Sequence, residues 1–273
     1  MGMKKDMINL PDFDDRDFVE RACSFIKQKV EESNSEGVVL GLSGGIDSAV
    51  VACLAVRALG SDNVIAYRLP SKTTSDEDLF DAKLVKDELD IFSPYISIED
   101  IHDYILNVCD KSDDNKKGKN DEIASANLKP RIRMAILYYF AAKHNYLVLG
   151  TGNKTELEIG YFTKYGDGGS DLLPIGDLYK EDVRKVAQTL GVPETVITKA
   201  PTAGLWEGQT DEDEIGMTYD VLDRILYLYV DNNEDASSIA DKLEIEKSEV
   251  ERIIRMVENA EHKRKTAPII SKF

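Results

Sequence analysis

The segment GVVLGLSGGIDSAVVACLAVRALG at 37–60 constrains the fold more than any other part of the chain. Residues 37–43 are apolar, partly β-branched and bounded by glycines, which indicates a short buried strand. Residues 48–59 are rich in Ala, Val and Leu and stop before Gly60, which predicts a helix. The chain therefore begins its core with a buried strand, a glycine-rich turn and an apolar helix.

The same alternation continues along the chain. Strands are predicted at 63–70 and 146–150, with a further extended piece at 91–98. Helices are predicted at about 14–32, 75–89, 99–110 and 122–144, with Pro130 as a kink or a restart of the last one, and a polar surface loop is expected at 111–122. From Asp211 to about His262 the pattern is helical. This order predicts an α/β fold, a Rossmann-like parallel sheet with helices on both faces and a helical C-terminal extension.

We expect one domain over residues 1–273. Its α/β core spans about 37–200, and a loop and the C-terminal helices follow at 201–273. At 273 residues the length fits one large domain or two small ones, and 42% hydrophobic residues are enough for a full core.

The charge balance excludes some partners. There are 34 Lys and Arg against 51 Asp and Glu, a formal charge of −17. A general nucleic-acid or anionic-membrane surface needs concentrated positive charge, so neither partner is expected. Small anionic ligands remain possible, because they need only a few local cations and backbone N–H groups.

Cysteine and histidine positions exclude other classes. Cys23, Cys53 and Cys109 are odd in number and widely spaced, which is neither a disulfide framework nor a zinc site. The longest apolar run, 134–142, is too short to cross a bilayer, and the N-terminus has no secretory signal. A reduced, cytoplasmic location is expected.

The turn at 41–48 is a candidate phosphate site. In an open parallel sheet, ligands bind at the carboxyl ends of strands, where loops lead into helix N-termini. Gly44 and Gly45 allow the backbone to approach an anion, and the N–H groups of the next helix then face it. Asp47 beside phosphates is explained best if Mg²⁺ lies between them.

The full S-G-G-x-D-S pattern resembles the pyrophosphate-binding loop of the ATP pyrophosphatase superfamily. Members of that superfamily split ATP between the α and β phosphates and adenylate a substrate. Further motifs are similar in order and spacing to the NAD synthetases, over Val38 to Pro268. They are NLKPRIRM (127–134), GTGNKTE (150–156), FTKYGDGGSDLLPIGDLYK (162–180), KAPTAGLWEGQTDEDEIG (199–216) and EHKRK (261–265).

The resemblance implies a role for each matching residue. ATP would be bound by Gly41, Leu42, Ser43, Gly44, Gly45, Ile46, Asp47, Ser48, Arg68, Thr151, Lys180 and Thr202. Mg²⁺ would be held by Asp47 and Glu156, and deamido-NAD by Arg131, Lys164, Asp171, His262 and Lys263. Asp47, Lys180 and Asp167 would be catalytic, with Asp167 near the incoming ammonia.

Three of these expectations come with alternatives or limits. His262 and Lys263 are equally explained as solvated residues at a helix C-terminus. Arg133, two residues after Arg131 on the same helix, is expected to face elsewhere. Residues 199–216, with Trp206 and Gln209, are predicted to form a lid over ATP.

The implied reaction is the amidation of deamido-NAD to NAD, in which ATP forms an acyl adenylate and is released as AMP and pyrophosphate. Glutamine-using relatives carry an additional glutaminase domain, for which this chain has no room, so free ammonia is the expected nitrogen donor. A separate glutaminase partner stays open, and the resemblance implies a homodimer. Two alternatives remain: another adenylating enzyme of the superfamily, such as a GMP synthetase-like subunit or an RNA-thiolating enzyme, and a non-catalytic adenine-nucleotide-binding protein.

Overall fold

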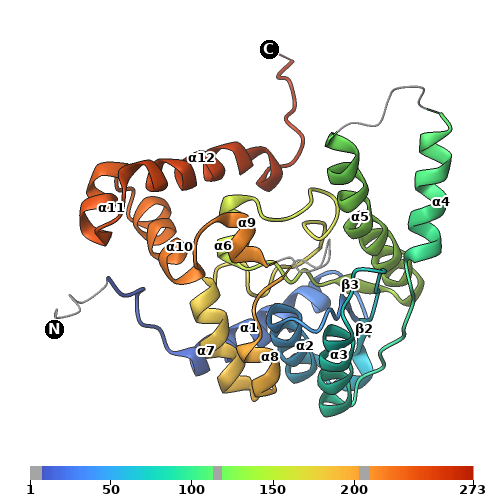
Figure 1. The fold of residues 1–273 in the computed structure, drawn as a ribbon. Helices are drawn as coiled ribbons and strands as arrows, with labels where there is room; N and C mark the ends of the chain where they lie inside the picture. Colours follow the sequence, from blue (N-terminus) through green and yellow to red (C-terminus); the bar gives the residue numbers. More distant parts are fainter. Residues whose placement is uncertain (1–7, 113–118, 203–209, 273) are drawn as a thin grey trace.

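The computed structural model describes residues 8–112, 119–202 and 210–272 (Figure 1). Its strands are β1 (Gly37–Gly41), β2 (Val64–Tyr67) and β3 (Tyr146–Val148). Its α-helices are α1 (Asp15–Glu32), α2 (Ile46–Leu59), α3 (Asp76–Leu89), α4 (Glu99–Asp110), α5 (Lys119–His144), α6 (Lys154–Ile159), α7 (Lys180–Leu190), α8 (Glu194–Thr198), α9 (Asp211–Ile215), α10 (Tyr219–Leu226), α11 (Ala236–Leu243) and α12 (Lys247–Arg264). A 3₁₀ turn, η1 (Ser61–Asn63), precedes β2, and a π turn, η2 (Tyr227–Asp231), follows α10.

The sheet is parallel, with the strand order β2-β1-β3. This confirms the predicted α/β class. The extended piece expected at 91–98 forms no regular strand, although Phe92 and Tyr95 make isolated parallel bridges to the β2 side. Pro94 stands between these two bridges, and proline has no N–H to give to a sheet ladder.

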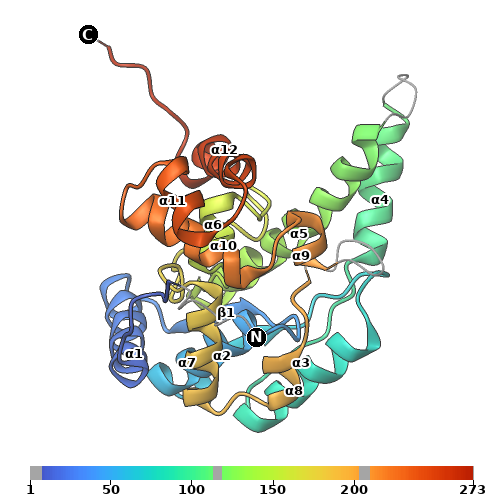
Figure 2. The same cartoon turned by 60° about the vertical axis from the view of Figure 1, so that its left-hand side comes forward.

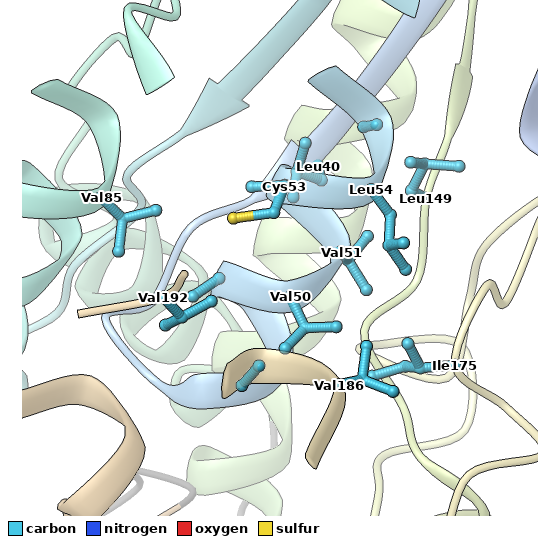
Figure 3. Close-up of a cluster of buried hydrophobic side chains, with 14 of the residues drawn as sticks. Leu40, Val50, Val51, Cys53, Leu54, Val85, Leu149, Ile175, Val186 and Val192 are labelled. Atoms are coloured by element: carbon cyan, nitrogen blue, oxygen red, sulfur yellow. The ribbon is translucent and has the colours of Figure 1, made fainter. Parts of the chain in front are cut away.

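Side chains of β1 alternate between the two faces of the sheet. Val38 and Leu40 enter a core built with α1, α2 and α7, whereas Val39 enters a second core with α5. Helix α2 is apolar around most of its circumference because it is buried between the sheet, α1 and α7. Figure 3 shows Val50, Val51 and Leu54 of α2 among side chains from β1, α3 and α7.

The C-terminal helices have a core of their own. Apolar residues of α10, α11 and α12 pack together, joined by Ile159 of α6 and Tyr179 before α7. In Figure 1, α10, α11 and α12 lie above the sheet, on the side where α6 and α9 are also found. The spaced apolar residues of 237–257, such as Ile239, Val250 and Ile253, are therefore helix-packing positions.

The prediction of a loop at 111–122 is wrong for residues 119–122. Residues 119–122 are the first turn of α5, and 113–118 lie outside the described part. Asp121 and Glu122 stabilise a helix N-terminus, which explains how this polar stretch is helical. Pro130 lies inside the continuous α5. Among the described residues, no helix combines the length and apolar character needed to cross a membrane.

Candidate active site

The conformation of the β1–α2 loop is stabilised by hydrogen bonds from its own serine side chains. Ser48 Oγ donates to Gly45 O (2.9 Å) and accepts from Ser43 N (3.2 Å), while Gly45 N donates to Ser43 Oγ (3.2 Å). Gly44 has φ +88°, and a Cβ there would lie 2.2 Å from Asp78 O. The two requirements, left-handed backbone and close approach to α3, explain a glycine at this position.

A buried lysine joins two of the predicted carboxylates. Lys180, at the start of α7, is 1% exposed, and its Nζ lies 2.6 Å from Asp47 Oδ2 and 3.3 Å from Glu156 Oε1. Asn153 completes the arrangement. Its Nδ2 donates to Asp47 Oδ1 (2.9 Å), and it forms a capping box with Glu156 at the start of α6.

Acidic side chains outnumber basic ones in this cluster. Burial raises the pKa of Glu156 to about 8, although the Lys180 ammonium opposes that shift. Burial opposes the charge of Lys180 as well, but the carboxylates of Asp47 and Glu156 raise its pKa above the ordinary value. Asp211, 4% exposed, adds a third carboxylate whose pKa is raised by burial. Three carboxylates thus share one ammonium, a donor set that suits a hard divalent cation.

The cluster opens into a cavity of about 540 Å³ at the carboxyl ends of β1 and β3. The predicted residues that line it are Gly41, Leu42, Ser43, Gly45, Ile46, Asp47, Ser48, Arg68, Thr151, Glu156, Asp167, Lys180, Thr202 and Lys263. Gly44 is not a lining residue, and its contribution is to the backbone turn of the loop. Trp206 and Gln209 of the predicted lid lie outside the described residues.

Four predicted deamido-NAD residues do not line this cavity. Arg131 is exposed, and its Nε donates weakly to Lys164 O (3.4 Å). Lys164 Nζ donates to the His262 carbonyl, and the His262 ring is exposed. Asp171 is used in the fold, because it accepts from Tyr138 Oη (3.1 Å) and from Val148 N of β3 (2.8 Å). The substrate roles of these residues stay predictions.

Arg133 and Arg131 face different directions, as expected, but it is Arg133 and not Arg131 that lines the cavity. The reason is that α5 turns its Ile132–Arg133 side toward the sheet and leaves Arg131 outside. Nε of Arg133 donates to Leu69 O (2.8 Å), just after β2. Asp211 and Asn153 are not among the residues predicted from the sequence, although the N-x-x-E spacing of Asn153 and Glu156 is that of a capping box.

Thr155 and Asp223 join the helices that carry the cluster. Thr155 Oγ1 accepts from Lys180 N (3.0 Å) and donates to Asp223 Oδ1 (2.5 Å), while Asp223 Oδ2 accepts from Glu181 N (3.0 Å). The N-cap of α7, Tyr179, makes no side-chain cap of its own. Residues of α6 and α10 therefore cap α7 and fix the first turn that carries Lys180.

Comparison with known proteins identifies the family. A family model described as NAD synthase matches residues 18–267. The chain belongs to the NAD synthase family. An NH₃-dependent NAD⁺ synthetase of Archaeoglobus fulgidus is 49% identical over 252 residues, 92% of this chain and 95% of the relative. The corresponding protein of Methanocaldococcus jannaschii is 46% identical over the same shares.

Solved structures of NAD synthase relatives have the same fold. The NMN synthetase of Francisella tularensis is 34% identical with a TM-score of 0.83, covering 96% of this chain and 100% of that one. The NH₃-dependent NAD synthetase of Campylobacter jejuni, solved with a nitrate ion, is 33% identical with a TM-score of 0.77, covering 95% and 100%. These relatives agree with the NAD synthase fold and with an ammonia-dependent ligase.

Replacing Asp223 with Asn tests the cap of α7. Burial raises the pKa of Asp223 to about 7, outweighing its bonds from Thr155 and Glu181. A folded-state pKa above the unfolded value means that stability is lost as pH rises through about 7. Between about pH 5 and about pH 8, the wild type should lose about 3 kcal/mol relative to Asp223→Asn. Urea unfolding at a series of pH values measures this difference.

The matched control is Asp241→Asn, which removes an exposed carboxylate on α11. Its unfolding free energy should follow that of the wild type at every pH. Parallel pH profiles for the wild type and Asp223→Asn would show that Asp223 does not titrate in this window.

Proposed function

We propose that this chain amidates deamido-NAD to NAD with ATP and ammonia, releasing AMP and pyrophosphate. The observation that carries the proposal is the Lys180–Asp47–Glu156 cluster, placed beneath the SGGIDS loop in the cavity. The names of the relatives at 42–49% identity support the same reaction.

ATP phosphates fit at the β1–α2 loop. The N-terminus of α2 faces the cavity there, and its N-cap Gly45 makes no side-chain cap that would compete for the first N–H groups. Lys180 provides a fixed positive charge, and its burial strengthens the attraction to phosphate oxygens. Asp47 and Glu156 would hold Mg²⁺, with Asp211 close enough to influence both; bound there, Mg²⁺ would neutralise charge on the leaving pyrophosphate.

Two chemical steps follow. The nicotinate carboxylate attacks the α-phosphorus in line and pyrophosphate leaves, which gives an acyl adenylate. Ammonia then attacks the acyl carbon, and AMP leaves with the electron pair of the broken C–O bond. Burial raises the pKa of Asp167, so its carboxylate is a better base than an exposed aspartate for a proton of the incoming nitrogen.

A second candidate substrate is the mononucleotide. The Francisella tularensis structure, at a TM-score of 0.83, is an NMN synthetase. The same adenylation and amidation on nicotinate mononucleotide needs the same phosphate loop, Lys180 and Asp167. The two substrates differ only in the adenylyl half, which lies away from the reacting carboxylate.

One assay decides among these possibilities. Mg-ATP, ammonium and deamido-NAD should give NAD, AMP and pyrophosphate in equal amounts. Glutamine in place of ammonium should give no more than background turnover. AMP and pyrophosphate without NAD would mean another adenylated substrate, and faster turnover of nicotinate mononucleotide would favour the second candidate. Binding of ATP without any turnover would favour a nucleotide-binding protein.

Asp47→Asn should lower kcat at least about 100-fold, because it removes a proposed cation ligand and a partner of Lys180. Excess Mg²⁺ should restore part of that loss, since the remaining carboxylates still attract the ion. Asp241→Asn, which removes an exposed charge on α11, is the control and should keep wild-type kcat. Full turnover by Asp47→Asn would remove the Mg²⁺ role.

We infer a homodimer, with a face of α4 as part of the interface. Ile101, Tyr104 and Val108 share one side of α4 and are 40%, 70% and 48% exposed. In Figure 2, α4 and α5 project together from the body of the molecule. Large exposed apolar side chains on a projecting element are typical of association surfaces. The apolar run 226–230, by contrast, places Leu226 and Leu228 in the core.

Sedimentation velocity at micromolar concentration should give a dimer. Tyr104→Glu should shift it toward monomer, because a charge would be buried in the interface. Lys111→Glu, at the exposed end of α4, controls for the added negative charge. A monomeric wild type would remove the dimer, and a dimeric Tyr104→Glu would place the interface elsewhere.

We also infer a cytoplasmic location, from free cysteines at 23, 53 and 109 in a chain whose described helices do not suit a bilayer. Fractionation of native cells, with the protein in the membrane or secreted fraction, would contradict it.

A further inference from the structure

Arg133 is a fixed cation at the cavity that lacks a counterion. Apart from the bond from Nε to Leu69 O, its guanidinium makes no hydrogen bond to a described residue, and no described carboxylate lies within 4.0 Å of it. Arg133 is half-buried, and this partial removal from water lowers the pKa of its guanidinium from the ordinary value. Because arginine stays charged in proteins, a negatively charged ligand group would be stabilised beside this guanidinium.

The buried arginine elsewhere in the chain shows the contrast. Arg224 is 6% exposed and has Asp220 at 2.7 Å and Glu181 at 3.5 Å. An arginine that only stabilises the fold is thus given carboxylate partners here. Arg133 has two Nη groups left over at a cavity wall.

Charges around Asp167 are in excess on the positive side. Arg133 and Lys263 both line the cavity, and both are influenced by the Asp167 carboxylate. Lys129 also influences Arg133, but it is not a lining residue and Glu99 acts on it. Lys263 Nζ is fixed by Gly160 O (2.7 Å) and Phe162 O (2.9 Å). The same cavity thus has excess negative charge around Lys180 and excess positive charge around Asp167.

The turn of α5 that carries Arg133 is held against the glycine-rich loop. A Cβ at Gly166 would lie 3.0 Å from Pro130, and one at Gly169 would lie 3.0 Å from Met134. These close packings leave little freedom for the backbone on either side of Arg133. The guanidinium is therefore positioned before any ligand arrives, which lowers the entropy lost on binding.

We propose that Arg133 binds the carboxylate of the pyridine substrate, the group that is adenylated and then amidated. The inference rests on the proposed function. Ammonia attacks the carbon of this same group, so the carboxylate belongs near Asp167, and Arg133 is a cation beside Asp167. A planar guanidinium with two unused Nη groups matches the two oxygens of a carboxylate.

After adenylation one of those oxygens bridges to AMP and the other remains the acyl oxygen. Attack by ammonia places negative charge on the acyl oxygen, which Arg133 stabilises until the C–O bond to AMP breaks. Arg133 thus acts on the reacting group in both steps.

Deamido-NAD and NAD form a matched pair of probes, because they differ only in carboxylate against carboxamide. Calorimetric titration of the full-length protein should show about 10- to 100-fold weaker binding of deamido-NAD by Arg133→Met, and less than about threefold change for NAD. Arg133→Lys should be intermediate, since it keeps the charge but loses the planar donors. Lys143→Met, an exposed cation on the same helix, should bind both probes like the wild type.

Each other result overturns the assignment. Equal weakening for the two probes would place Arg133 at the pyrophosphate, and a change confined to ATP would place it at the triphosphate. Unchanged binding in a variant with wild-type thermal unfolding would remove any ligand role; if Arg133→Met does not fold, Arg133→Lys is read in the same way. Wild-type protein that binds and turns over no deamido-NAD would refute the proposed function itself, independently of Arg133.

Discussion

The ion pair between Lys180 and the carboxylates of Asp47 and Glu156 is the interaction around which the site is organised. It joins the start of α2, α6 and α7, three elements from distant parts of the chain. Breaking one partner of a buried ion pair leaves an uncompensated charge, which costs several kcal/mol. The cluster therefore links the geometry of the site to the packing of three helices, and one change there affects both.

The C-terminal helices contribute to this site directly, through Lys263 of α12 at the cavity wall, and also indirectly. Asp223 of α10 accepts from Thr155 and from the first turn of α7, so the packing of α10 reaches Lys180 through two hydrogen bonds. Tyr219 of the same helix lies with its ring 5.2 Å from Lys180 Nζ and donates to Asp211. A fold with an α/β core alone would leave the lysine without these supports.

Charge in the cavity is divided by sign, and the division fits a reaction between two anions. The carboxylates around Lys180 suit a divalent cation that carries phosphates, and Arg133 is the cation that we propose for the substrate carboxylate. Two negatively charged substrates repel each other in water. A cavity with separate cationic supports offsets that repulsion and holds the reacting groups in place.

The local sequence pattern predicts most of the helices and strands. It fails where contacts between distant segments determine the local structure or the placement of a side chain. Arg131 and Arg133 are chemically identical two residues apart, and only the packing of α5 on the sheet shows which one reaches the cavity. The polar stretch 119–122 has no apolar periodicity, yet it is helical as part of α5. Residues 91–98 have strand composition, but Pro94 limits their pairing to isolated bridges.

The sequence by itself determined the parallel α/β class, the glycine-rich turn between β1 and α2 and the NAD synthase motifs, because these depend on short-range spacing and on residue type. Tertiary structure alone decided the pairing of Lys180 with Asp47 and Glu156, the cap that Thr155 and Asp223 give to α7, and the placement of Arg133. Those contacts join residues between 24 and 133 positions apart or depend on which side of a helix is buried. Spacing along the chain carries no information about such distances until the sheet and its helices have packed.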